Sequence, residues 1–363
     1  MPDGLPEFYG WKMTGAALLV LLVGVAGLRW RRRRRQARRS LWPTTAILSV
    51  AVCAGAMILL EVSFSVCYDQ TDTMTLTNVS RRWFERHVRA NNAGARDSQP
   101  FTPIPPPGVF RITLVGDSFT YGHGIRDVED RFGDQLKNRL DESAPGRFQV
   151  YNWALCGADT QDHINIIKLL SLGEFNCNLV LLVYVLNDAC PLLPESEELA
   201  RQAQYLQPHF PLFRDTYLFN FLYWRFVHLS MTPARDYATW IPHAYQEPFW
   251  SKHREQLEQI VTLCRQQGWE LRVVTFPLLQ SLGPHYPLRD AHDRLASFWT
   301  EHEISNVDLL PILEAHDVGD LVVNRFDAHP NELAHRLAAQ AIYEHILTPD
   351  AAIQAARAGE IAR

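Results

Sequence analysis

Two long apolar segments near the N-terminus most restrict the folds open to this chain of 363 residues. They cover residues 13–28 and 41–60, and the second is long enough to cross a membrane as a helix. The first reaches that length only if Trp11 and Trp30 are counted as its interfacial ends. We therefore expect a hairpin of two transmembrane helices within residues 1–61.

An arginine-rich run between the two apolar segments, at residues 29–39, predicts how the hairpin is oriented. Arginine clusters beside a membrane span normally stay on the cytoplasmic side. Both helices would then run outward from a cytoplasmic loop, with everything after Glu61 on the outer, periplasmic side. A cleaved signal peptide would carry positive charge before its apolar run, whereas Asp3 and Glu7 precede this one. The sequence thus predicts a multi-pass membrane protein.

The formal net charge of −5 hides an uneven distribution, because the arginine run holds much of the positive charge. The rest of the chain is acidic and shows no broad basic face, so we expect no nucleic-acid partner. The six cysteines form no paired Cys-x-x-Cys pattern, and we expect neither a metal nor a cofactor. The sequence leaves open whether Cys156 and Cys190 form a disulfide, and it leaves the oligomeric state open as well.

A larger domain is predicted to follow the hairpin. Residues 62–108 are interpreted as a connector whose proline-rich end, residues 103–107, forms a stiff linker. The domain itself is predicted to cover residues 109–349, and residues 350–363 are expected to form a C-terminal tail.

Short runs rich in valine, leucine and isoleucine alternate with stretches of helical spacing within this domain. Continuous apolar runs are typical of strands that are covered on both faces of a parallel sheet. We therefore predict a three-layer α/β/α fold with a mostly parallel sheet. The expected strands are residues 111–115, 148–152, 179–185, 270–276 and 306–309. The expected helices are residues 131–140, 162–170, 250–267 and 331–347.

An insertion rich in proline and aromatic residues, residues 190–249, interrupts this alternation. Because it follows the third predicted strand, it would lie at the sheet edge where ligands bind in such folds. It could form a lid or a substrate wall there. The alternative is that its aromatic residues form the core of a helical excursion.

Two short motifs contain the residue types of an acyl-transfer centre. The tripeptide Gly-Asp-Ser, residues 116–118, follows an apolar run, so a buried strand would deliver Ser118 onto a turn. The segment Asp-Ala-His-Pro-Asn, residues 327–331, supplies Asp327 and His329 close together. A serine hydroxyl is a poor nucleophile until a base removes its proton, and histidine with a carboxylate supplies that base.

Four blocks of the predicted domain resemble those of the SGNH hydrolase superfamily, also called GDSL hydrolases, in a membrane-anchored form of bacterial type. They are residues 116–118, 152–157, 184–188 and 327–331, and they occur in the order typical of the superfamily. The resemblance covers roughly residues 110–347. The pattern is too widespread in the superfamily to identify a substrate.

The resemblance implies a role for each matching residue. Ser118 would be the nucleophile, His329 the base and Asp327 the triad acid. The backbone N–H groups of Ser118 and Gly157 and the side chain of Asn187 would form the oxyanion hole. Such donors must already point at the oxygen on which charge develops.

Two departures from the superfamily pattern bear on this assignment. Val185 stands where many members have a glycine, which would shift the loop that carries Asn187. Asp327 precedes His329 by two positions, whereas three is the commoner spacing, and some relatives that transfer acetyl groups to surface polysaccharides resemble the shorter form.

Each motif also has a plainer interpretation. Gly-Asp-Ser is a common turn sequence, and residues 327–331 could cap the last helix with Asn331. Asp327 and His329 could also bind a metal, but no third ligand stands out nearby. His123 could line the pocket, but a surface turn is the preferred interpretation. The ordered occurrence of all four blocks favours catalysis.

The sequence therefore predicts a membrane-anchored SGNH-type esterase with an outward-facing catalytic domain. Its substrate would be a glycan or lipid of the cell envelope that carries an acetyl group or a longer acyl chain. One alternative is an O-acyltransferase that uses the same centre with a sugar hydroxyl in place of water. Another is a non-catalytic envelope scaffold that retains the fold.

Overall fold

The computed structural model describes residues 5–359 and divides into two compact units. The smaller unit contains the N-terminal part up to Gln70, with Thr75–Trp83 and Tyr205–Ser230. The larger unit contains Thr71–Met74, Phe84–Gln204 and the chain from Met231 onward. Residues 1–4 of the predicted hairpin and 360–363 of the predicted tail lie outside the described residues. The boundaries predicted after residues 61, 108 and 349 stay predictions.

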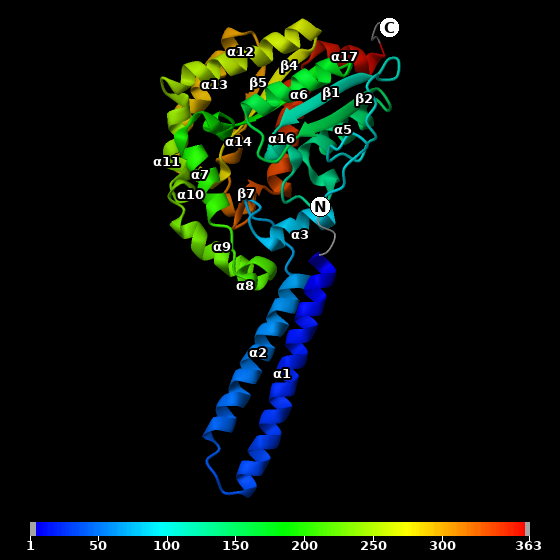
Figure 1. The fold of residues 1–363 in the computed structure, drawn as a ribbon. Helices are drawn as coiled ribbons and strands as arrows, with labels where there is room; N and C mark the ends of the chain where they lie inside the picture. The colour runs from blue at the N-terminus through cyan, green and yellow to red at the C-terminus, as the bar shows by residue number, and fades with distance from the viewer. Residues whose placement is uncertain (1–4, 360–363) are drawn as a thin grey trace. The chain divides into compact units, whose positions relative to one another are not determined.

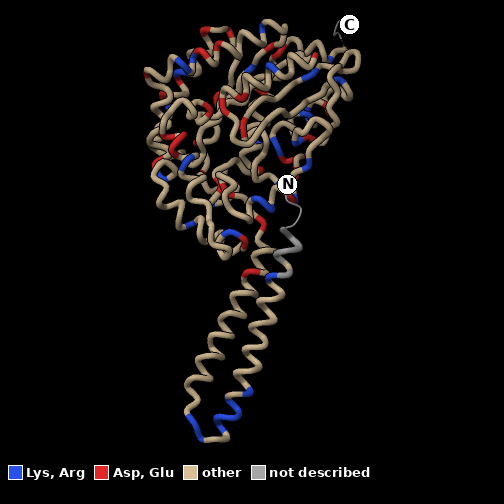
Figure 2. The backbone as a smooth tube through the Cα atoms, in the orientation of Figure 1, with Lys and Arg blue, Asp and Glu red and all other residues tan. Residues whose placement is uncertain are grey.

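The smaller unit is built on a hairpin of helices α1 (Leu5–Gln36) and α2 (Trp42–Cys67). Both helices are long and apolar enough to cross a membrane. Helix α1 does not end at Leu28 but continues through most of the arginine run, because arginine is a good helix former and no proline interrupts it. Figure 2 shows Lys and Arg gathered at the closed end of the hairpin, with an uncharged stretch along both helices.

Part of the aromatic insertion belongs to this smaller unit. Helix α8 (Pro211–Asp215) and helix α9 (Leu218–Ser230) contain six of its aromatic residues. The buried carboxylate of Glu61 in α2 accepts hydrogen bonds from the backbone N–H groups of Tyr217 (2.6 Å) and Leu218 (2.8 Å). A carboxylate is favourable at a helix N-terminus because it satisfies free N–H donors there, so Glu61 fixes the start of α9 to α2.

The larger unit contains a five-stranded sheet in which every neighbouring pair of strands is parallel. The strand order is β2-β1-β3-β4-β5, so β1 lies between β2 and β3. The strands are β1 (Phe110–Gly116), β2 (Phe148–Ala154), β3 (Leu179–Val185), β4 (Glu270–Phe276) and β5 (Asn306–Asp308). All residues of β1 and β3 are buried, as expected for continuous apolar runs covered on both faces.

Helices pack on both faces of this sheet (Figure 1). Helix α6 (Thr160–Leu172) packs against α12 (Phe249–Gln267), and α5 (Phe132–Ser143) packs against α16 (Glu332–Ile342). Helix α12 ends where Gly268 adopts a left-handed conformation with φ of 69°. The predicted three-layer α/β/α fold with two preceding apolar helices is therefore confirmed.

Shorter elements complete the structure. The remaining helices are α3 (Asn78–His87), α4 (Ser118–Tyr121), α7 (Pro194–Tyr205), α10 (Thr232–Arg235), α11 (Tyr237–Trp240), α13 (Arg289–Glu301), α14 (Leu310–Leu313), α15 (Val318–Leu321) and α17 (Ala351–Ala358). A separate antiparallel pair is formed by β6 (Val322–Asn324) and β7 (Asp327–Pro330). Cys156 and Cys190, whose pairing the sequence left open, are both free.

Candidate active site

The Gly-Asp-Ser motif lies where strand β1 turns into the short helix α4. The carboxylate of Asp117 accepts a hydrogen bond from Phe119 N (2.8 Å) and so caps α4 at its N-terminus. Gly116 is required by close packing, because a Cβ at this position would collide with the Thr120 side chain. This local structure holds Ser118 at the C-terminal edge of the sheet.

The structure brings Ser118, His329 and Asp327 into one chain of hydrogen bonds. His329 Nε2 lies 2.8 Å from Ser118 Oγ, and His329 Nδ1 lies 2.5 Å from Asp327 Oδ1. The three residues are buried, with exposed fractions of 8% for Ser118, 5% for His329 and 1% for Asp327. A base within hydrogen-bond reach of both a hydroxyl and a carboxylate has the geometry needed to activate the hydroxyl.

The short spacing of Asp327 and His329 follows from strand geometry. Both residues belong to β7, and alternate residues of a strand project to the same side. A separation of two therefore places the carboxylate beside the imidazole. Asn331 then caps α16 by accepting hydrogen bonds from Leu333 N (3.0 Å) and Ala334 N (3.1 Å). The segment thus caps the helix, as the plainer interpretation proposed, and also presents an acid and a base.

The second oxygen of Asp327 has partners from two other segments. Thr71 Oγ1 donates a hydrogen bond to Oδ2, and His123 Nε2 lies 3.4 Å from the same oxygen. The segment that contains Thr71 is also bound to β7, because the Thr73 hydroxyl accepts a hydrogen bond from Ala328 N at 3.0 Å. Residues 71–74 therefore form part of the site, although they lie in the stretch predicted as a connector.

His123 is not part of a surface turn, and that prediction is wrong. Its side chain is 2% exposed and stacks on His329 with ring centroids 4.0 Å apart and an interplanar angle of 14°. Gly122 and Gly124 flank it with φ values of 77° and 82°, which are conformations that favour glycine. A Cβ on Gly124 would also meet Val323. The two glycines therefore allow the loop to turn His123 inward.

The surroundings of Asp327 and His329 shift the pKa values of both side chains. Burial alone would raise the pKa of Asp327, but His329 and His123 outweigh it and hold this pKa well below its usual range. Burial lowers the pKa of His329, His123 lowers it further, and Asp327 opposes both effects. Both directions favour an ionised Asp327 and a neutral His329 at neutral pH.

The predicted oxyanion donors follow the strands on either side of β1. Gly157 comes three residues after β2, with φ of 77°, and Asn187 comes two residues after β3. Because the strands are parallel, both residues lie at the same edge of the sheet as Ser118. Val185 N donates a hydrogen bond to Asp188 Oδ2 (3.0 Å), which braces the loop that carries Asn187.

Two buried carboxyl groups are next in sequence to candidate site residues, Asp117 to Ser118 and Asp188 to Asn187. Burial raises the pKa of Asp117 to about 7, and it raises the pKa of Asp188 well above its usual range, with Asp117 adding to the effect. Asp117 Oδ2 lies 3.4 Å from Ser118 Oγ, whereas His329 Nε2 lies 2.8 Å from it. His329 is thus the better placed base for Ser118.

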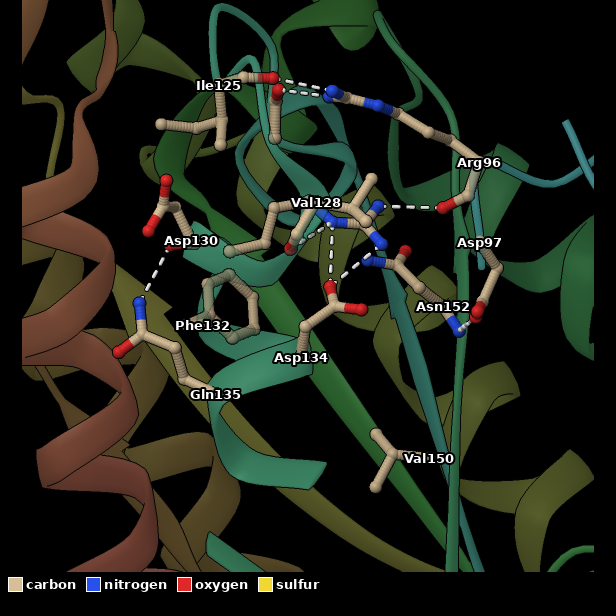
Figure 3. Close-up of polar contacts among 12 residues, drawn as sticks. Arg96, Asp97, Ile125, Val128, Asp130, Phe132, Asp134, Gln135, Val150 and Asn152 are labelled. Carbon is tan, nitrogen blue, oxygen red and sulfur yellow. Dashed lines mark hydrogen bonds and ion pairs between the residues drawn. The ribbon is translucent and has the colours of Figure 1, made fainter. Parts of the chain in front are cut away.

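Two buried arginines brace the loop between α4 and α5. Arg96 donates hydrogen bonds to the carbonyl oxygens of Gly122 (2.5 Å) and Ile125 (2.5 Å), as Figure 3 shows for Ile125. Arg131 donates to the carbonyl oxygen of Arg96 (2.7 Å) and to Asp134 (2.9 Å). Burial lowers the pKa of Arg96 to about 10, and the neighbouring Arg131 adds to this. These bonds fix the backbone on both sides of His123.

Among the described residues, one group of His, Cys, Asp or Glu side chains has atoms close enough to hold a metal ion. It consists of His123, Asp327 and His329, whose candidate ligand atoms all lie within 4.8 Å of one another. The group overlaps the triad, and the nitrogens of His329 already face Asp327 and Ser118. The donor set therefore fits a hydrogen-bonded triad better than a metal centre.

Sequence reasoning identified five of the residues at this sheet edge but missed Thr71, His123 and Arg96. Thr71 is separated from Asp327 by 256 positions, so no local pattern could pair them. His123 had a detectable signal, because a histidine between two glycines directly after the serine motif has the backbone freedom to turn inward.

The model of the GDSL-like lipase/acylhydrolase family matches residues 114–337, more than half of the chain. The chain has no match among curated proteins.

Similar solved structures include a lipolytic protein of the G-D-S-L family from Veillonella parvula, with 16% identity, 66% of this chain and 100% of that chain covered, and a TM-score of 0.39. The acetylxylan esterase Axe2 from Geobacillus stearothermophilus shows 13% identity, with 68% and 96% covered and a TM-score of 0.42. The esterase EstA from Pseudoalteromonas sp. shows 14% identity, with 65% and 96% covered and a TM-score of 0.41. These scores are low, and the assignment rests on the sequence match. By that match, the chain belongs to the GDSL-like lipase/acylhydrolase family.

Proposed function

We propose that the protein is a serine hydrolase that cleaves ester-linked acyl groups through Ser118, His329 and Asp327. The observation that carries this proposal is the pair of hydrogen-bond distances at His329, 2.8 Å to Ser118 Oγ and 2.5 Å to Asp327 Oδ1. Membership of a lipase and acylhydrolase family supports ester hydrolysis as the reaction class.

The proposed reaction has two halves. His329 Nε2 takes the proton of Ser118 as Oγ attacks the ester carbonyl carbon, and the same nitrogen then protonates the leaving alcohol. An acyl-serine remains. Water attacks its carbonyl carbon as His329 takes a proton from the water; the bond to Ser118 Oγ then breaks, His329 returns the proton to Oγ, and the free acid leaves. The N–H groups of Ser118 and Gly157 and the Asn187 amide would stabilise the oxyanion in both halves. In an acyltransferase, a sugar hydroxyl would replace water in the second half.

Covalent labelling tests the nucleophile. A fluorophosphonate probe should modify Ser118 of the detergent-solubilised full-length protein, because the probe traps an activated serine. Peptide mass spectrometry should locate the adduct on the peptide that contains Ser118. An unlabelled protein, or one labelled at another serine, would contradict the proposal.

We further propose that α1 and α2 anchor the protein in a membrane, with the catalytic domain on the outer side. The length and apolar character of both helices support the anchor, and the arginines near their turn support the orientation. This location favours an acylated glycan or lipid of the cell envelope as substrate.

Reporter fusions test the proposed orientation. A reporter that is active only outside the cytoplasm should give a signal when it is fused to either end of the chain, because both ends would lie outside. A cytoplasmic signal from the C-terminal fusion would overturn the orientation and the envelope substrate with it.

A further inference from the structure

The carboxylate of Asp327 faces a nitrogen of each of two stacked imidazole rings, and the proposed reaction uses only one of the rings. His329 Nδ1 lies 2.5 Å from Oδ1, and His123 Nε2 lies 3.4 Å from Oδ2. The ring centroids of the two histidines are 4.0 Å apart. Each oxygen of the carboxylate therefore faces its own histidine.

The hydrogen-bond partners of His123 fix which nitrogen carries its proton. Nε2 faces Asp327 Oδ2 and also the carbonyl oxygen of Asp72, at 3.2 Å. Both oxygens are acceptors, so Nε2 must be the protonated nitrogen. Nδ1 lies 3.8 Å from the sulfur of Cys156. His123 can thus donate toward Asp327 in its neutral and its charged form.

The position of His123 is rigidly supported. Arg96 donates hydrogen bonds to the carbonyl oxygens of Gly122 and Ile125, which lie on either side of His123 in the sequence. The ring of Phe84 packs edge-on against the imidazole, with centroids 4.9 Å apart. A side chain held in this way restricts the movement of the groups that it contacts.

We propose that His123 is a positioning residue for the reaction proposed above. It fixes the carboxylate of Asp327 through Oδ2, while His329 faces Oδ1, and its ring fixes the plane of the His329 imidazole by stacking. This assignment rests on the proposed function, because it assumes that His329 is the base. His123 takes no part in the proton transfers and acts through its two neighbours, Asp327 and His329.

His123 also affects the charge balance around His329. Among the described residues, other titratable groups near the histidine pair include Asp327, Asp72, Cys156 and His335. His123 lowers the pKa of His329, whereas Asp327 and Asp72 raise it. Loss of His123 should therefore raise this pKa, so that His329 becomes protonated, and inactive as a base, at a higher pH than in the wild type.

Two substitutions separate the contributions of the ring and the donor. His123→Phe keeps a flat ring for stacking but removes the N–H that faces Asp327. His123→Gln removes the ring but can place an amide N–H near Oδ2. We expect His123→Phe to lower kcat roughly tenfold with little change in KM, since a small displacement of a catalytic group slows the reaction and leaves substrate binding intact. His123→Gln should recover part of that loss.

The measurement is the pH dependence of kcat/KM for p-nitrophenyl acetate with the full-length protein in detergent. In both variants the acid limb should move to higher pH, because His123 lowers the pKa of His329 and this contribution is lost with the imidazole. His292→Phe is the matched control, since His292 is also buried and pairs with an aspartate, Asp308 (2.8 Å), that is not part of the triad. This control should change thermal stability without moving the acid limb.

A purely structural role for His123 would give a different result. Unchanged kcat and an unmoved acid limb in His123→Phe, with only a lower melting temperature, would overturn the proposal. If His123→Phe does not fold, an unmoved limb in His123→Gln would overturn it equally. Failure of the fluorophosphonate probe to label the wild type would contradict the proposed function, and this proposal with it.

Discussion

Replacing Ser118 with alanine is expected to lower kcat for ester hydrolysis by about 10⁶-fold. The methyl group cannot attack a carbonyl carbon, so the acyl-serine intermediate cannot form. KM should change much less, because Ser118 Oγ is one small group among those that contact the substrate. The rate of p-nitrophenyl acetate hydrolysis by the full-length protein in detergent measures this loss.

A second serine substitution controls for nonspecific effects on the preparation. Ser297 in α13 is exposed and donates a hydrogen bond to the carbonyl oxygen of Asp293 (2.7 Å), within its own helix. Ser297→Ala should retain wild-type kcat. If Ser118→Ala hydrolysed the ester as fast as Ser297→Ala, Ser118 would not be the nucleophile.

Apolar runs were sufficient to predict the central sheet. All residues of strands β1 and β3 are buried, and such runs have few alternatives to a parallel sheet. Helix α13 was not predicted, although its buried residues Ala291, Leu295 and Phe298 follow helical spacing. Charged and polar residues stand between these apolar positions, so the segment contains no continuous apolar run.

The candidate site was predictable only where its residues form local motifs. Ser118 and His329 lie in short blocks at strand ends or within a strand, so a sequence pattern marks each of them. Thr71 has no such pattern, because it contacts Asp327 only through tertiary packing. His123 lies beside a recognised motif, but its burial depends on backbone contacts with Arg96, which is remote in sequence. Support from distant segments of this kind is visible only in the folded chain.

The substitution Asp327→Asn is expected to lower kcat by about 10⁴-fold, and the partners of Asp327 explain why. Thr71 Oγ1 and His123 Nε2 both face Oδ2 as donors. An asparagine would therefore place its carbonyl oxygen there and its NH₂ group toward His329 Nδ1. Nδ1 would have to accept that hydrogen bond, which moves the imidazole proton to Nε2. A protonated Nε2 cannot take the proton of Ser118, and no negative charge would remain to stabilise the imidazolium.

This argument separates Asp327→Asn from a simple loss of packing. The variant is nearly isosteric, so its melting temperature should fall much less than its kcat, and its KM should stay close to the wild-type value. Asp320→Asn, at an exposed position in the same region of the chain, should retain wild-type kcat. A loss smaller than about tenfold in Asp327→Asn would mean that His329 keeps its working tautomer without the carboxylate, and Asp327 would then not be the triad acid.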